Sequence, residues 1–156
     1  MIQIPKKIIE EIFTHARKDA PIEACGYLTG EKTCIVSNCD IDRPMDIIVE
    51  EPVVRKRYPM RNVDASPEHF TLDPREQLQV IKQARAEGQT LLAVYHTHPA
   101  SPARPSEEDI RLAFDPTISY VIASLFEKKE TIRSFQIKQG QVEEENILII
   151  EGLKFI

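Results

Sequence analysis

The chain has 156 residues, of which 42% are apolar and 29% are charged. A chain of this length is typical of one domain and is long enough to bury its own core without disulfides. The formal net charge of −5, an aromatic content of 6% and the lack of tryptophan argue against nucleic acid as the main partner, because phosphate binding leaves a basic footprint and unpaired bases stack on aromatic rings.

Cysteine usage and hydropathy argue against several further classes of protein. Cys25, Cys34 and Cys39 are odd in number and form no CxxC pair, so neither a disulfide framework nor a cysteine-rich zinc site is expected. Residues 1–13 contain acidic side chains where a signal peptide has its apolar run, and eighteen consecutive apolar residues occur nowhere. The sequence therefore predicts a cytoplasmic protein with no membrane partner.

The first predicted element is a helix over residues 6–19, where apolar side chains recur at helical spacing. Pro21 ends this helix. Two short strands are expected next, over residues 23–30 and 32–38, with a turn that begins at Gly30 between them.

Residues 39–72 are the least regular part of the chain. They contain four prolines and mix short apolar pairs with charged side chains. This composition predicts a long connection with one or two short strands, near residues 47–49 and 69–72. Because long connections in compact domains are often functional, this segment is a candidate for binding a substrate.

A second helix is predicted to follow this connection. Asp73 can cap it, Pro74 suits its first position, and Gly88 is a natural stop. The apolar run at residues 90–96 then predicts a buried strand.

The last third of the chain predicts one more helix and three strands. Prolines forbid a helix in residues 97–105, and Ser106 can cap a helix that ends near Asp115. The expected strands cover residues 118–126, 131–137 and 145–150. Since neither a repeat nor a linker is visible, we expect a single α/β domain over residues 1–156.

The chemistry of the chain is concentrated between residues 96 and 109. His96 and His98 are two residues apart at the end of a strand, so both imidazoles face the same side. Asp109 falls in the first turn of the third helix, where its carboxylate could point back at them. Two imidazoles and a carboxylate suit Zn²⁺, and a catalytic zinc site leaves its fourth position to water, whose pKa the metal lowers to about 7.

Two more polar residues extend this candidate site. A zinc hydrolase needs a base that takes a proton from water and passes it to the leaving amine. Glu23, next to the small residues Ala24 and Gly26, is the candidate, since small neighbours would allow a close approach of substrate or metal. The hydroxyl of Ser106 could donate to the oxyanion of a tetrahedral intermediate.

Each of these residues also has a simpler structural interpretation. A lone HxH pair is often only packed, Ser106 is a natural N-cap, and Asp109 is an acid favoured by the helix dipole. Glu23 by itself is a carboxylate at a strand end. The complete pattern H-x-H-x7-S-x2-D rarely occurs by chance, so the combination favours the metal site.

The string HTHPASPARPSEED at residues 96–109 resembles the JAMM signature of the MPN-domain metallopeptidases, in which HxHP is followed by a serine and an aspartate at these spacings. The upstream EACGYLTG at residues 23–30 resembles the strand that begins with the catalytic glutamate of this family. The implied fold is an MPN-type (cytidine-deaminase-like) α/β domain, with a mixed and mainly antiparallel sheet flanked by about three helices.

The resemblance also implies a role for each site residue. His96, His98 and Asp109 would be the zinc ligands, Glu23 the general acid and base, and Ser106 a support for the tetrahedral intermediate. The implied activity is that of a zinc-dependent peptidase or isopeptidase, which uses metal-activated water. It would cleave next to the C-terminal Gly-Gly of a ubiquitin-like or sulfur-carrier protein, whose tail would lie along a sheet edge. The small size resembles the bacterial and archaeal members.

Two other functions remain as alternatives. Some MPN domains are non-catalytic scaffolds that mediate assembly, although these usually lack the metal ligands. A zinc nucleobase deaminase expects H-x-E and P-C-x-x-C, and neither pattern occurs here.

A basic cluster lies outside the motif and consists of Arg55, Lys56, Arg57 and Arg61. It predicts a solvated charged face or, alternatively, a docking surface for an acidic partner such as a sulfur carrier.

Overall fold

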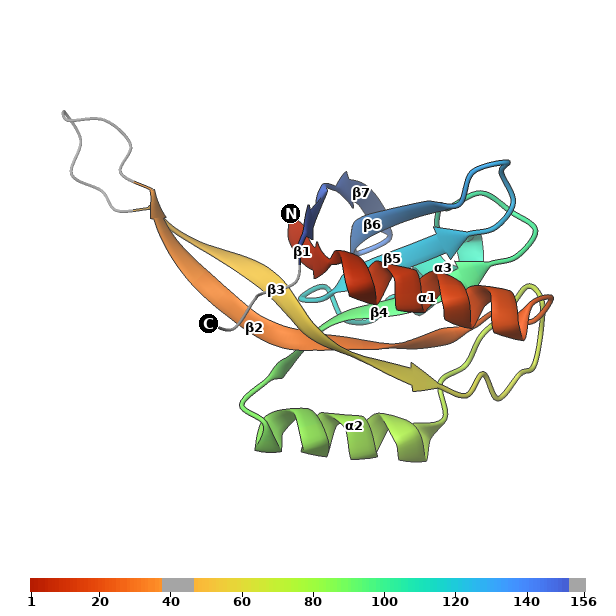
Figure 1. Ribbon diagram of the computed structural model, residues 1–156, viewed down its shortest axis with the longest axis horizontal. Helices are drawn as coiled ribbons and strands as arrows, with labels where there is room; N and C mark the ends of the chain where they lie inside the picture. The colour runs from red at the N-terminus through yellow and green to blue at the C-terminus, as the bar shows by residue number, and fades with distance from the viewer. Residues whose placement is uncertain (38–46, 152–156) are drawn as a thin grey trace.

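The computed structural model describes residues 1–37 and 47–151. These residues form one eight-stranded sheet in the order β7-β6-β5-β4-β2-β3-β1-β8, flanked by helices (Figure 1). The strands are β1 (Ile2–Pro5), β2 (Cys25–Ser37), β3 (Ile47–Met60), β4 (Thr90–His98), β5 (Ser119–Ser124), β6 (Thr131–Lys138), β7 (Gln141–Glu145) and β8 (Ile147–Ile150). The helices are α1 (Lys6–Asp19), α2 (Pro74–Ala86) and α3 (Glu107–Leu112).

The sheet is mixed and mainly antiparallel, which confirms the expected fold class. Antiparallel pairs join β2 to β3 and β4, and β6 to β5 and β7. Parallel pairs join β4 to β5, and β1 to β3 and β8. The edge strands β7 and β8 are consecutive in the chain and are separated only by Asn146, so the sheet curls until its two edges meet.

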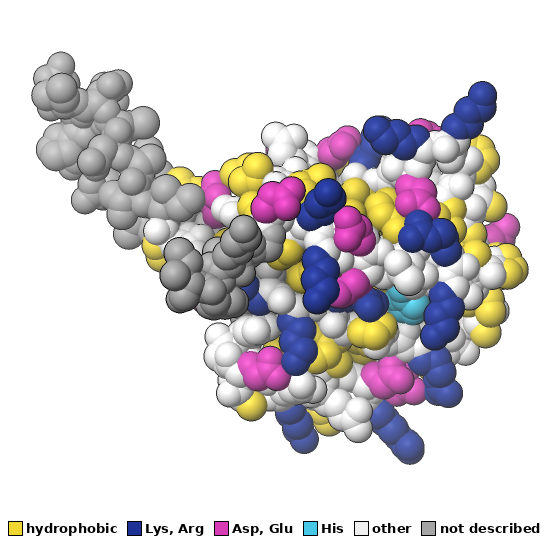
Figure 2. Space-filling model, in the orientation of Figure 1, with side chains coloured by type: hydrophobic (Ala, Val, Ile, Leu, Met, Phe, Trp, Pro, Cys, Tyr) yellow, Lys and Arg dark blue, Asp and Glu magenta, His cyan; other side chains and the backbone are white. Residues whose placement is uncertain are grey.

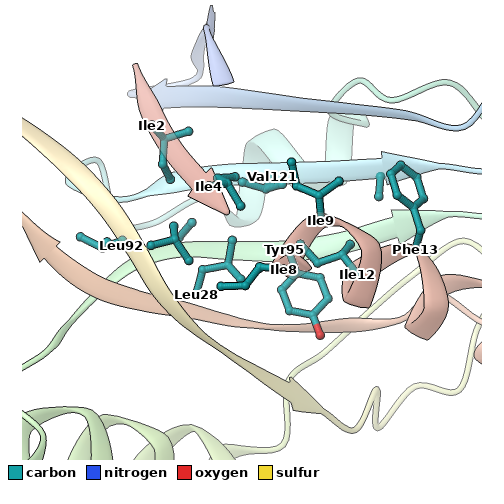
Figure 3. Packing of buried hydrophobic residues seen from close by; sticks show 13 residues of the cluster. Ile2, Ile4, Ile8, Ile9, Ile12, Phe13, Leu28, Leu92, Tyr95 and Val121 are labelled. Atoms are coloured by element: carbon teal, nitrogen blue, oxygen red, sulfur yellow. The ribbon is translucent and has the colours of Figure 1, made fainter. Parts of the chain in front are cut away.

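Helix α1 covers one face of the sheet. Its apolar stripe packs against β1 and the central strands (Figure 3). The helix residues of this cluster are Ile8, Ile9, Ile12 and Phe13, and its central-strand members include Leu28, Leu92, Tyr95 and Val121. Fully burying a side chain of this size stabilises the fold by about 1.5–3 kcal/mol, so this cluster holds α1 firmly on the sheet.

The opposite face carries α2 and α3. Val80 of α2 packs with Tyr27 and Tyr58 of the central strands, and Ile110 of α3 packs against Ile122 of β5. Because side chains alternate along a strand, β4 turns one set of residues toward α1 and the next set toward α2 and α3.

The two strands expected at residues 23–30 and 32–38 form the single strand β2, so the predicted turn at Gly30 is wrong. The register with β3 shifts between Thr29 and Gly30. A Cβ at Gly30 would lie 2.0 Å from the Val53 carbonyl oxygen. The glycine therefore allows a close strand approach at an irregularity in the ladder.

Position 26 requires a glycine for a related reason. A Cβ at this position would lie 2.2 Å from the carbonyl oxygen of Tyr58 and 2.6 Å from the ring of Tyr95. Close packing within the protein therefore accounts for the glycine at position 26. The close approach of a substrate or metal, which the sequence suggested as the reason, is not required to explain it.

We expect Gly26→Ala to lower the free energy of unfolding by about 3 kcal/mol, because backbone and a fully buried ring would both have to move. Denaturant unfolding measures this loss. Gly88→Ala is the matched control, since its Cβ would meet nothing within 4 Å and only its φ of +71° opposes alanine, a cost of about 1 kcal/mol. Equal losses in the two variants would contradict the steric explanation.

The largest departure from the sequence prediction is β3. A strand runs through residues 47–60, where mostly irregular chain was expected, and it pairs with β2 over its whole length. Its prolines, Pro52 and Pro59, are tolerated because β1 pairs with β3 only at Val53, which leaves most of the outer edge of β3 without ladder bonds. Near residues 69–72 only a single bridge forms, between Leu72 and Asn62.

Other differences are small. The short strands β1 and β7 were not predicted, β4 continues to His98, and β8 corresponds to the expected final strand. Cys39 lies outside the described residues. Among the residues that the structure describes, no helix is both long and apolar enough to span a bilayer.

Candidate metal centre

The two histidines of the motif point to the same side of β4, toward the face that carries α2 and α3. His96 is 2% exposed and His98 is 5% exposed. Their Nε2 atoms are 3.1 Å apart. The period of the strand thus brings both imidazoles to one point, as their spacing predicts.

Asp109 completes this cluster from the first turn of α3. Its Oδ2 atom lies 3.3 Å from Nε2 of His96 and 3.5 Å from Nε2 of His98. A capping box with Ser106 orients the carboxylate: the Ser106 N–H donates to Oδ2 at 2.8 Å, and the Asp109 N–H donates to the Ser106 Oγ at 3.1 Å. The capping box therefore both begins the helix and orients the Asp109 carboxylate toward the histidines.

These three atoms fit a divalent metal. In a tetrahedral zinc site with bonds of 2.0–2.2 Å, neighbouring ligand atoms are about 3.3–3.6 Å apart, close to the separations of 3.1, 3.3 and 3.5 Å in the cluster. Nδ1 of His98 donates to the carbonyl of Pro102 at 2.8 Å. That bond fixes the tautomer and leaves the Nε2 lone pair free for a metal.

The protonation states also suit a metal. Burial lowers the pKa of His96 and so favours the neutral imidazole, which is the form that binds metals. Burial alone would raise the pKa of Asp109, but hydrogen bonds with His96 and His98 outweigh it and hold this pKa well below its usual range. Burial also acts to lower the pKa of His98, but hydrogen bonds with Asp109 and Pro102 raise it, so a metal would displace a proton from this ring when it is charged.

Glu23 lies beside this cluster. Its side chain is 4% exposed, and its Oε1 is 4.0 Å from Nε2 of His98. The neighbouring Ala24 is fixed to β4 by two bonds with Thr97, from N–H to Oγ1 at 2.8 Å and from the Thr97 N–H to the Ala24 carbonyl at 2.9 Å. Burial raises the pKa of Glu23 to about 7, although the charge of His98 opposes the shift.

The fifth residue of the predicted set, Ser106, lies next to the cluster through its bonds with Asp109. Its Oγ accepts the helix-capping bond, which leaves the hydroxyl hydrogen available for another acceptor. The structural role as an N-cap is thus compatible with donation to a substrate.

Two residues at the site were not assigned to it from the sequence. The ring of Phe70 stacks on His96 with centroids 4.4 Å apart. The neighbouring His69 contacts Glu108 through Nδ1 and Oε2, so the segment before α2 reaches α3 across the site. Only their position in the long connection hinted at such a role, because contacts between distant loops leave no periodic pattern.

An apolar groove of about 490 Å³ begins at the cluster, with His96 and Asp109 in its wall. It runs between α2 and α3 over the sheet. Its other walls include Phe70, Leu112, Phe114, Ile118, Tyr120 and Ile122. A substrate that reaches the metal centre therefore has an apolar surface beside it.

The basic cluster does not form one patch. Alternation along β3 sends neighbouring side chains to opposite faces, and each has an acidic partner. The pairs are Arg55–Glu31, Lys56–Glu87, Arg57–Glu11 and Arg61–Asp73. Figure 2 likewise shows basic and acidic side chains interspersed over the face that carries α1. This arrangement favours the solvated-face interpretation over an acidic docking partner.

The fold and the cluster define a metalloenzyme of the JAB/MPN type. Residues 5–138 match the family model described as prokaryotic homologs of the JAB domain, so the chain belongs to that family. A protein from Archaeoglobus fulgidus described as a JAB1/MPN domain protein shares the fold, with a TM-score of 0.57 and 17% identity over 96% of this chain and 97% of that one.

More similar proteins define the class further. A CysO-cysteine peptidase from Mycobacterium tuberculosis is 32% identical over 97% of this chain and 92% of that protein. A probable TtuB-protein conjugate cleaving protease from Thermus thermophilus is 30% identical over 90% of this chain and 79% of that protein. The solution structure of protein DSY2949 from Desulfitobacterium hafniense is 46% identical with a TM-score of 0.81, over 99% of this chain and 96% of that one.

The chain is accordingly an enzyme, a metallopeptidase of the JAMM type. The expected family is confirmed, and the non-catalytic scaffold is not supported.

Proposed function

We propose that the chain is a zinc-dependent peptidase or isopeptidase that cleaves after the C-terminal Gly-Gly of a ubiquitin-like or sulfur-carrier protein. The observation that carries this proposal is the convergence of His96, His98 and Asp109 beside the buried carboxyl of Glu23. In the proposal the first three residues hold Zn²⁺, which when bound acts as a Lewis acid and lowers the pKa of water to about 7.

The remaining residues move and stabilise charge. Glu23 accepts a proton from the attacking water at a carboxylate oxygen and later donates it to the leaving amine. In the metal-free chain burial raises the pKa of Glu23 to about 7, and a carboxyl whose pKa is raised by burial is suited to accept and then donate a proton near neutral pH. The Ser106 hydroxyl donates to the developing oxyanion.

Two features support a Gly-Gly substrate. The contact between His69 and Glu108 joins the segment before α2 to α3 at the site, and glycine, which has no side chain, would allow a substrate backbone to approach the metal centre closely beside this contact. Two relatives carry names that refer to CysO-cysteine and to TtuB-protein conjugates. We extend this substrate class to the present chain.

The direct test uses a small ubiquitin-like sulfur-carrier protein whose Gly-Gly end is extended by cysteine, and the same protein linked to a lysine side chain. We expect the zinc-loaded chain to release a product that ends at Gly-Gly, as measured by mass spectrometry, and 1,10-phenanthroline to stop the release. A substrate ending in Ala-Ala is the matched control. Cleavage of neither conjugate, or cleavage insensitive to the chelator, would contradict the proposal.

The groove gives a separate prediction about substrate binding. Phe114 is 82% exposed at the groove, so Phe114→Ala should leave the thermal midpoint unchanged and raise KM about tenfold, the effect of losing about 1.4 kcal/mol of apolar contact. Steady-state kinetics on the preferred conjugate measures the change. The control is Phe126→Ala, which removes a ring that is 57% exposed and does not line this groove. A similar KM for both variants would exclude a role for the groove.

A further inference from the structure

Glu23 lies just before the sheet, so no β-ladder holds its backbone. Strand β2 begins at Cys25, and the connecting segment at residues 61–73 binds Glu23 instead. The Glu23 N–H donates to the carbonyl of Ser66 at 2.9 Å, and the Glu23 carbonyl accepts from Nδ2 of Asn62 at 3.1 Å. The position of the Glu23 carboxyl therefore depends on this segment.

The side-chain amide of Asn62 makes four hydrogen bonds, which is its full capacity. Besides the bond to Glu23, Nδ2 donates to the carbonyl of His69 at 2.8 Å. Oδ1 accepts from the N–H groups of Asp64 and Thr71, each at 3.1 Å. Because all four partners are backbone groups, one amide fixes the shape of the segment around it.

Two of these bonds flank Phe70. The carbonyl of His69 precedes Phe70 and the N–H of Thr71 follows it, so Asn62 holds the backbone on both sides of this ring. The ring in turn stacks on His96. A single side chain therefore connects the backbone of Glu23 with the aromatic contact on His96.

We propose that Asn62 is a positioning residue for the peptidase reaction and acts through Glu23 and Phe70. This inference rests on the proposed function. The amide holds the Glu23 carboxyl on the His98 side of the cluster and keeps Phe70 against His96. Asn62 does not line the groove, although Phe70 does, so the larger effect of Asn62 falls on the chemical step through Glu23 and a smaller one on substrate binding through Phe70. A displacement of about 1 Å at a reacting group costs about 10²-fold in rate.

The kinetic test compares Asn62→Ala with Asn62→Asp, which keeps the two acceptor positions and lacks the two donors. We expect kcat to fall about 10²-fold in both variants, with KM and bound zinc per chain within about threefold of the parent. Asp64→Ala is the matched control, because it removes only the bond from the Thr71 hydroxyl in the same segment, and its kcat should stay within about twofold.

Two kinetic outcomes would overturn the inference. One is a kcat within about threefold of the parent in the Asn62 variants, and the other is a loss of zinc in proportion to activity. If Asn62→Ala does not fold, Asn62→Asp decides the question.

Hydrogen exchange supplies a readout that needs no substrate. In Asn62→Ala, which removes the acceptor of the Thr71 N–H, the amides of Glu23 and Thr71 should both exchange at least about tenfold faster. In Asn62→Asp, which keeps that acceptor, the Glu23 amide should do so alone, whereas in both variants the Thr97 amide, bonded to the Ala24 carbonyl, should change less than about threefold. Unchanged exchange at Glu23 and Thr71 contradicts the positioning role. Failure of the parent enzyme to cleave either conjugate contradicts the proposed function instead, so the two failures are distinguishable.

Discussion

Glu23→Gln is expected to lower kcat by about 10³-fold while the protein keeps its fold and its zinc. An amide has nearly the same shape as the carboxyl but cannot take a proton from water, and general acid–base catalysis contributes about 10²- to 10⁴-fold. Glu23 is not one of the three clustered ligand residues, and its Oε1 is 4.0 Å from His98. Single-turnover cleavage of the Gly-Gly conjugate and zinc per chain measure both parts of the expectation.

The same substitution has a predictable effect on the metal-free protein. Burial raises the pKa of Glu23 to about 7 in the folded state, so the folded chain binds this proton more tightly than the unfolded chain. The ionised carboxylate therefore costs stability as the pH rises through 7. Glutamine removes that cost, and the thermal midpoint of the metal-free variant at pH 8 should equal or exceed that of the parent.

Glu107→Gln is the matched control for this variant. Glu107 is exposed in the first turn of α3, and its replacement should leave kcat within about twofold. If Glu23→Gln retains full turnover with zinc bound, Glu23 is not the base. If instead it loses its zinc, Glu23 helps to hold the metal.

The candidate site was predictable because its geometry is local. Two histidines on one strand must share a face, and a serine and an aspartate at the start of a helix form a capping box that aims the carboxylate. The proximity of Glu23 to this cluster was implied by a family resemblance and not by spacing, since Glu23 lies 73 positions before His96. That proximity depends on the pairing of β2 with β4.

The parts that the sequence did not predict depend on contacts between distant segments. Strand β3 shows no clean alternation of apolar and polar residues. Its charged side chains form ion pairs with residues far away in the chain, such as Arg55 with Glu31 and Lys56 with Glu87. Its partner β2 also contains a shift in register. The roles of Phe70 and Asn62 likewise become visible only in the structure, where Phe70 stacks on His96 and Asn62 donates to the Glu23 carbonyl. Neither residue belongs to a helix or strand whose periodic pattern could have indicated its role.

Asp109→Asn is expected to abolish zinc binding and cleavage together. The amide keeps an oxygen for the Ser106 N–H but loses the negative charge that two imidazoles alone cannot replace. We expect zinc affinity to fall by more than about 10²-fold, beyond the 10- to 100-fold effect of changing an outer partner of a ligand. Zinc at 100 times its dissociation constant should stabilise the parent by about 2.7 kcal/mol, and this gain should vanish in the variant.

Calorimetric zinc titration and unfolding with and without zinc measure these effects, and Asp64→Asn is the control with the same chemical change away from the cluster. The two site variants must differ: Glu23→Gln keeps the zinc-dependent stabilisation and loses turnover, whereas Asp109→Asn loses both. If Asp109→Asn bound zinc as tightly as the parent, the cluster of His96, His98 and Asp109 would not be the metal site, however well its distances of 3.1–3.5 Å fit. The pair of variants therefore separates the group that holds the metal from the group that moves the proton.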